Sequence, residues 1–299
     1  MTVSQGDETS PPTRAVRPGE REPSASDAPA TASGRRLRWW RELLYMAAFY
    51  LVYSWIRNQF GSAGNDAAGV AFAHARDVIG LQDAVGLWFE PELQRWYLDL
   101  PGMGAIRAWN IYYGTAHFLV TAGALIWLYR RQPDRYSVWR TTLAAMTAVA
   151  LVGFASYSLM PPRLLDDTSK FGACYQRGED CNGYDVVDTL EVHGGWLSFQ
   201  DEEVAEVSNQ YAAMPSMHTG WSTWSAFVMW GLVRRRWARS LVVLYPLATV
   251  FGILITGNHY WLDAVGGWAA FAVGFGAARV VTMWNEGRFA RREPSPAST

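Results

Sequence analysis

The sequence is poor in several features that would assign it to a familiar class. It has only two cysteines, and its formal net charge of −1 gives no case for nucleic-acid binding. Residues 1–37 contain no apolar stretch, so no secretory signal peptide is visible there. No internal repeat stands out, and no hydrophobic segment has the pattern of a strand. These absences leave an all-α protein as the predicted fold class.

The hydrophobic residues that are present are sufficient for one large domain. They make up 50% of the 299 residues, and 14% of all residues are aromatic. Residues 1–37 are rich in Pro, Ser, Ala, Thr and charge, which predicts a disordered cytoplasmic tail. A shorter tail is predicted over 286–299. Between them we expect a membrane-embedded domain over 38–285, interrupted by a long polar loop at 161–212.

Six segments are apolar enough to be predicted as membrane-spanning helices. They lie at about 43–56, 104–129, 139–160, 216–233, 241–256 and 262–283. The last segment contains four glycines that are typical of close helix packing, Gly266, Gly267, Gly274 and Gly276. Residues 61–100 have only a partial apolar stripe, which predicts an amphipathic interfacial helix on the membrane or beside the bundle.

Arginine placement predicts the orientation of this six-helix bundle. With six spans, every cluster falls on one side of the membrane, and the positive-inside rule makes that side the cytoplasm. Both termini are then cytoplasmic, and the 161–212 loop is extracytoplasmic. The clusters are Arg35, Arg36, Arg38 and Arg41; Arg130, Arg131, Arg135 and Arg140; Arg234, Arg235, Arg236 and Arg239; and Arg288, Arg291 and Arg292.

A polar loop becomes a hydrophobic helix at residues 213–222. Pro215 fits a first helical turn, and Ser216 can bind the free N–H groups of a helix start. His218 follows one turn inside, where the N–H groups and the helix dipole favour an anion. Alone, this pattern is equally well explained by a capped helix with an interfacial histidine.

Two further stretches add polar groups at the ends of apolar segments. His259 and Asp263 have the i, i+4 spacing that lets a carboxylate hold an imidazole N–H. Arg163 follows another apolar segment, although an arginine there can also simply bind carbonyl groups at a helix end. Together with His218, these residues are suited to binding a phosphate and attacking its phosphorus.

These motifs resemble a known family. Pro-Ser-Met-His at 215–218, His-Tyr-Trp-Leu-Asp at 259–263 and Pro-Pro-Arg at 161–163 resemble the type-2 phosphatidic acid phosphatase superfamily. The resemblance covers roughly residues 40–285 and is closer to the inositolphosphotransferase branch, which includes proteins similar to inositol phosphorylceramide synthase. Many relatives carry an arginine six residues before the second histidine, where this chain has Ile253. That departure favours the transferase-like branch.

The residues and the resemblance predict the same division of labour. Asp263 orients His259, whose other ring nitrogen is the nucleophile, and His218 moves a proton to and from the departing and incoming oxygens. The acidic residues of the 161–212 loop match no Ca²⁺ or Zn²⁺ ligand pattern, and the mechanism needs no metal or other cofactor. The non-bridging phosphate oxygens are expected to be held by Arg163, Ser216, Met217 and Thr219.

The remaining histidines and the two cysteines are weaker candidates. His117 is an ionisable group within a predicted span and so a functional candidate, but a core histidine bonded to a neighbouring helix is an equal alternative. His74 and His193 are expected to be surface residues. Cys174 and Cys181 can pair if their loop faces an oxidising compartment; otherwise they are two unrelated thiols.

The sequence thus predicts an integral cell-membrane enzyme whose substrate is a lipid phosphate or phospholipid. It is expected to transfer a phosphoryl or inositolphosphoryl-like headgroup unit through a phosphohistidine intermediate. The alternative is a lipid phosphate phosphatase, acting on phosphatidic acid or a prenyl phosphate with water as acceptor. A non-catalytic scaffold or transporter is less favoured, because both histidine positions and the aspartate position are filled.

Overall fold

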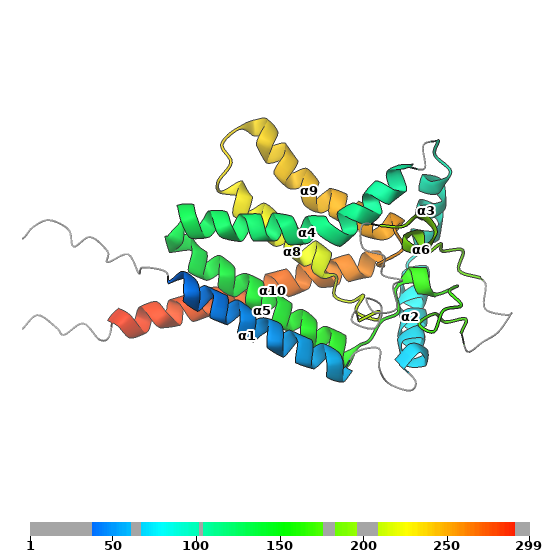
Figure 1. The fold of residues 1–299 in the computed structure, drawn as a ribbon, viewed down its shortest axis with the longest axis horizontal. Helices are drawn as coiled ribbons and strands as arrows, with labels where there is room; N and C mark the ends of the chain where they lie inside the picture. Colours follow the sequence, from blue (N-terminus) through cyan, green and yellow to red (C-terminus); the bar gives the residue numbers. More distant parts are fainter. Residues whose placement is uncertain (1–37, 61–66, 102–103, 176–182, 196–208, 291–299) are drawn as a thin grey trace, which may run out of the picture. The chain divides into compact units, whose positions relative to one another are not determined.

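The chain forms a bundle of helices, drawn in Figure 1. The computed structural model describes residues 38–60, 67–101, 104–175, 183–195 and 209–290. Within these ranges there is no strand, and an isolated bridge joins Leu159 to Ala212. The all-α prediction is therefore confirmed for the described part of the chain.

The helices follow the apolar segments closely. They are α1 (Trp39–Phe60), α2 (Ala67–Ala84), α3 (Glu90–Leu98), α4 (Gly104–Arg131), α5 (Pro133–Ser156), the 3₁₀ turn η1 (Pro162–Leu164), α6 (Thr189–His193), α8 (Met217–Trp230), α9 (Arg236–Ile255) and α10 (Trp261–Ala290). The last helix extends into the segment predicted as a tail at 286–299. The predicted tail at 1–37 lies outside the described residues.

Four of the described helices are long and apolar enough to cross a membrane, namely α4, α5, α9 and α10. The other two predicted spans became α1 and α8, which do not reach that standard. Helix α8 has 14 residues; at about 1.5 Å per residue it is roughly 21 Å long, shorter than a hydrocarbon core of about 30 Å. Its segment is rich in apolar residues, but its helix ends before the following polar turn.

Glycines let α10 lie close to its neighbours. A side chain at Gly274 would collide with the backbone of Met146 on α5, and one at Gly267 would collide with the Ser216 carbonyl. Close packing was predicted for both positions, but the same prediction is wrong for Gly276, which has open space around it. The contact at Gly267 matters most, since it brings the start of α8 against α10.

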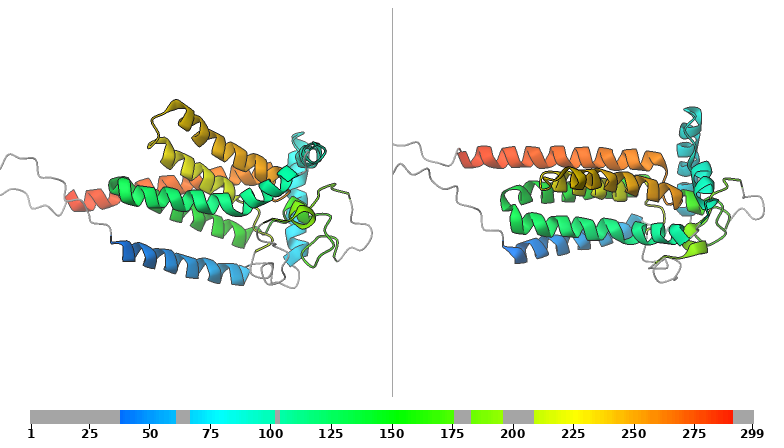
Figure 2. Two further views of the ribbon diagram at one scale, coloured as in Figure 1. Left: turned by 45° about the horizontal axis from the view of Figure 1, so that its top comes forward. Right: turned by 90° about the horizontal axis from the view of Figure 1, so that it is seen from above.

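The region predicted as one amphipathic helix is two helices, α2 and α3, joined by a turn in which Gly86 has a φ of 67°. Figure 2 shows them across the end of the bundle at which α9 ends and α10 begins. The buried face of α2 includes Phe72 and Val78 and packs on the polar loop and on Tyr260. His74 on this helix was predicted to be a surface residue. His74 is half-buried, and its Nδ1 lies 2.7 Å from the Ser158 carbonyl.

Arginine-rich helix ends meet at the opposite end of the bundle. Arg140 of α5 forms an ion pair with Glu42 of α1, with 2.7 Å between nitrogen and oxygen. Arg135 lies against Gly231, which ends α8. The first turns of α1 and α5 and the connection from α8 to α9 therefore share one end, and the sequence motifs lie at the other.

Candidate active site

The turn between α9 and α10 presents His259. Gly257 has a φ of 69°, a conformation that glycine adopts without strain. The turn is closed by the backbone N–H groups of Asn258 and His259, which donate to the Ile253 carbonyl at 3.1 and 3.2 Å. Backbone hydrogen bonds alone therefore fix the position of His259 in this turn.

Asp263 completes this turn from the first turn of α10. Its Oδ2 accepts the Tyr260 backbone N–H at 2.9 Å and lies 3.1 Å from His259 Nδ1. A carboxylate oxygen can only accept here, so His259 Nδ1 carries the hydrogen and Nε2 keeps its lone pair. The contact expected from the i, i+4 spacing is present. It leaves Nε2 of His259 as an available nucleophile.

The start of α8 is fastened to the same turn. Ser216 caps the helix, since its Oγ accepts the Thr219 N–H at 3.4 Å. Its own N–H donates to the Asp263 carbonyl at 2.9 Å. This junction places His218 beside His259, with His218 Nδ1 3.4 Å from His259 Nε2. Two motifs separated by some forty residues in sequence therefore form one site.

Helix α4 forms the wall behind His218. Tyr113 stacks on the His218 ring, with centroids 4.2 Å apart and planes 18° apart. The His117 ring lies 4.1 Å from the His218 ring. His117 is 7% exposed, and its Nδ1 donates to the carbonyl of Tyr113 at 3.1 Å. His117 thus bonds its own helix, and its ring contacts a predicted catalytic residue.

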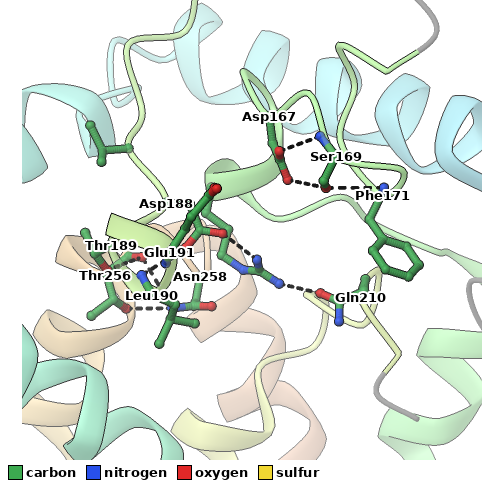
Figure 3. Close-up of polar contacts among 12 residues, drawn as sticks. Asp167, Ser169, Phe171, Asp188, Thr189, Leu190, Glu191, Gln210, Thr256 and Asn258 are labelled. Atoms are coloured by element: carbon green, nitrogen blue, oxygen red, sulfur yellow. Dashed lines mark hydrogen bonds and ion pairs between the residues drawn. The ribbon is translucent and has the colours of Figure 1, made fainter. Parts of the chain in front are cut away.

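Arg163 is held in place by residues of the polar loop. Its guanidinium donates to Asp188 at 2.7 Å and to Gln210 at 2.5 Å, and Figure 3 shows these two acceptors. Its backbone N–H donates to the Gly257 carbonyl at 2.7 Å. The alternative was that the Arg163 side chain binds carbonyl groups at a helix end, and the structure does not show such a contact among the described residues. Its guanidinium binds a carboxylate and an amide instead.

A cavity of about 90 Å³ has both Arg163 and His259 in its wall. Arg163 and His259 line it together with Asn209, Gln210 and Asn258. His218 instead borders a narrower space with His117 and Ile253, and Tyr113 borders both. A ligand in the larger cavity would therefore meet His259 and Arg163 first.

The predicted phosphate-binding residues divide into two groups. Arg163 lines the cavity, whereas Ser216, Met217 and Thr219 are not among its lining residues. Ser216 and Thr219 are fully buried, and within the described part of the chain the Thr219 hydroxyl has no hydrogen-bond partner. Met217 contributes the first backbone N–H of α8, a group with no carbonyl one turn earlier to bind.

Several residues of the site were missed from the sequence. Tyr113 is one of them, and its i, i+4 spacing from His117, which was already a functional candidate, is a usable signal. Asn258 directly precedes His259. Asp188 and Gln210 offered no signal, because they lie 25 and 47 residues from Arg163 in an irregular loop.

The predicted cysteine pair is only partly visible. Cys174 is buried in the polar loop, whereas Cys181 lies outside the described residues. Cys174 is disulfide-bonded, and its pairing with Cys181 stays a prediction.

Comparison with known proteins places this geometry in a family. The family model described as the PAP2 superfamily matches residues 76–277, more than half of the chain. No curated protein and no solved structure matches the chain. Members of this superfamily are phosphatases or phosphotransferases, and His259, Asp263, His218 and Arg163 all fall within the matched range. The chain therefore belongs to the PAP2 superfamily, which supports an enzyme that acts on phosphate esters.

Proposed function

We propose that this chain is an integral-membrane phosphotransferase that moves the phospho-headgroup of a lipid onto an alcohol through a phosphohistidine at His259. The observation that carries the proposal is the position of His259. Its Nδ1 is bound by Asp263, and the residue lines a cavity that also contains Arg163. This arrangement provides a neutral, oriented nitrogen beside a cation that can bind phosphate oxygens.

The reaction then has two displacements at phosphorus. In the first, Nε2 of His259 forms a bond to phosphorus while the bond to the leaving oxygen breaks, and protonated His218 donates its proton to that oxygen. In the second, the acceptor hydroxyl attacks phosphorus, gives its proton to His218, and the P–N bond breaks. Arg163 stabilises the charge on the non-bridging oxygens in both steps.

Substrate binding must separate the two histidine rings. Their facing nitrogens are 3.4 Å apart, a distance that leaves no room for a phosphorus atom between them. A reacting group needs about 3–3.5 Å from the nucleophile on its own side. We therefore expect His218 to move away from His259 when the phosphate enters.

The charge of the cavity favours a phosphodiester over a phosphomonoester. Among the described lining residues, Arg163 is the one cation, and its guanidinium is already paired with Asp188. Ile253 stands where many relatives have a second arginine, and it is buried. A monoester phosphate carries about −1.5 to −2 charges near neutrality, whereas a diester carries a single charge. A site with so little positive charge suits the transfer of a phospho-headgroup.

The amide side chains of the cavity favour a polyol. Asn209, Gln210 and Asn258 line it beside Arg163. Each amide can both donate and accept a hydrogen bond, which matches the hydroxyls of an inositol-like headgroup. The same steps with water as acceptor would make the protein a lipid phosphatase, and the experiment below separates the two outcomes.

We further propose that α1 and α8 complete a six-span arrangement with the site on the extracytoplasmic face. The exposed side of α1 includes Leu43, Leu44 and Leu51. Leu81, Val85 and Trp96 are exposed on and beside α2 and α3, which supports an interfacial position for these helices. The arginine-rich ends lie opposite the site, and the positive-inside rule assigns them to the cytoplasm.

The test is incubation of the purified protein with a panel of phospholipids and prenyl phosphates, with and without a polyol or lipid alcohol, followed by mass spectrometry. The expected product is a new phosphodiester on the alcohol, accompanied by acid-labile phosphate on the protein. His259→Ala is the control and should give neither. Release of a free headgroup phosphate or inorganic phosphate, unchanged by added alcohol, would identify a phosphatase instead.

A further inference from the structure

Three buried polar residues on α2 and α3 have no place in the mechanism above. Gln82, Glu90 and Gln94 are 0%, 2% and 1% exposed. A buried polar or charged group is unfavourable unless it is hydrogen-bonded. The identities of their partners therefore indicate what these side chains do.

Glu90 binds the first residue of α10. Its Oε1 accepts the backbone N–H of Trp261 at 2.9 Å and the amide of Gln82 at 2.6 Å, and its Oε2 accepts the N–H of Phe89 at 3.1 Å. The free N–H groups at a helix start are favourable partners for a carboxylate. Glu90 thus fixes the start of the helix that carries Asp263.

Gln94 binds the last residue of α9 and the polar loop. Its amide nitrogen donates to the carbonyls of Ile255 at 3.2 Å and Val187 at 3.0 Å. Its oxygen accepts the Val187 N–H at 2.8 Å. Val187 directly precedes Asp188, the residue that binds Arg163. Gln94 thus joins the end of α9 to the segment that holds the cation.

We propose that Glu90 and Gln94 are positioning residues that hold both ends of the His259 turn and set its distance from Arg163. The proposal rests on the phosphoryl-transfer function proposed above. Glu90 acts at Trp261, after the turn, and Gln94 acts at Ile255, before it. Helix α3, which is not one of the candidate membrane spans, therefore helps to position His259.

The hydrogen-bond directions identify informative variants. All three partners of Glu90 are donors, so in Glu90→Gln the new N–H₂ faces a donor. In Gln94→Glu a carboxylate oxygen would face the carbonyls of Ile255 and Val187. The matched control is Glu92→Gln, the same chemical change on α3 at an exposed position.

The kinetic arm uses bis(nitrophenyl) phosphate, a phosphodiester whose good leaving group makes attack by His259 the step most sensitive to alignment. We expect Glu90→Gln and Gln94→Glu to lower kcat by about tenfold to a hundredfold, because small misplacements of reacting groups have effects of this size. KM should change less than about twofold, and Glu92→Gln should match the wild type. Equal kinetics for Glu90→Gln and Glu92→Gln would overturn the proposal.

A second arm does not depend on activity. Amide hydrogen exchange of peptides covering 256–261 should be faster in Glu90→Gln and Gln94→Glu, whereas peptides from α4 and α5 should be unchanged, which shows that the variants are folded. If the wild type has no phosphotransferase or phosphatase activity, the proposed function fails, and the exchange result still decides whether these residues hold the turn. Unchanged exchange at 256–261 would refute the positioning role in either case.

Discussion

His259 and His218 face each other, but their surroundings differ in kind. His259 is held by hydrogen bonds, from Asp263 on its ring and from the Ile253 carbonyl on its backbone. His218 lies against the rings of Tyr113 and His117, with the Tyr113 carbonyl as a further neighbour. A carboxylate bonds one ring nitrogen and fixes a tautomer, whereas stacked rings fix the plane of an imidazole without bonding its nitrogens. The first environment suits a nucleophile and the second suits a proton carrier.

The sharpest test of this comparison is His259→Ala. In the proposed mechanism this variant has no nucleophile, so we expect neither phosphoenzyme nor turnover with any leaving group. Phosphoenzyme is measured by trapping acid-labile phosphate, and turnover with an alkyl and an aryl phosphate ester. Retained activity in His259→Ala, together with loss of phosphoenzyme in His218→Ala, would require the two roles to be exchanged.

Asp263→Asn should have the next largest effect. Asp263 Oδ2 accepts two donors, His259 Nδ1 and the Tyr260 N–H. An amide can turn its N–H₂ toward His259 and favour the other tautomer, as occurs when the aspartate of a catalytic triad is changed, with a loss of about 10⁴-fold. We expect a loss of up to about that size with alkyl and aryl esters alike. A loss confined to alkyl esters would instead place Asp263 on the proton-transfer side.

His218→Ala should be sensitive to the leaving group. General acid catalysis contributes about 10²–10⁴-fold, and an acidic phenol needs little of it. We expect a loss in that range with an alkyl phosphodiester and a much smaller loss with bis(nitrophenyl) phosphate, measured as kcat/KM. An equal loss with both esters would mean that His218 binds the phosphate rather than moving a proton.

These tests concern the part of the site that was predictable from the sequence. The His259–Asp263 pair and the Ser216 cap are local, so a short sequence spacing and capping rules suffice to predict them, although His259 lies in the turn before α10 and not on the helix itself. The supports of the site are not local: Arg163 meets Asp188 and Gln210 across 25 and 47 residues, and Gln94 meets Ile255 across 161. Such contacts depend on how helices and an irregular loop pack together. The apolar composition of the segment was enough to locate α8. It was not enough to show that the helix is too short to be counted as a span, because that depends on where the helix ends.

His117 offers a finer test of the aromatic side. His117→Leu keeps much of the buried volume but removes the bond to the Tyr113 carbonyl and the ring against His218. If His117 acts by orienting His218, the variant should show a smaller version of the His218→Ala pattern, about tenfold with an alkyl phosphodiester and little with bis(nitrophenyl) phosphate. The half-buried His193 provides the control variant His193→Leu, which should change neither ratio. Equal losses of activity with both esters in His117→Leu would indicate general damage to packing.

The smallest expected effect is a pH dependence of protein stability that comes from Glu90, which supports the His259 turn. Burial raises the pKa of the Glu90 carboxyl above its ordinary value of 4.5, because desolvation outweighs the hydrogen bonds from Trp261 and Gln82. The folded protein therefore holds this proton more tightly than the unfolded chain does. The contribution of Glu90 to the free energy of unfolding is then greatest below pH 4.5 and decreases as the pH rises through the folded-state pKa.

Glu90→Gln lacks this titration, so the unfolding midpoint of the wild type relative to this variant should fall as the pH rises above 4.5. Thermal unfolding in detergent across that window measures the difference, with Glu92→Gln as the control that keeps the wild-type slope. A difference that rises with pH would mean that the three hydrogen bonds to the carboxylate outweigh its burial.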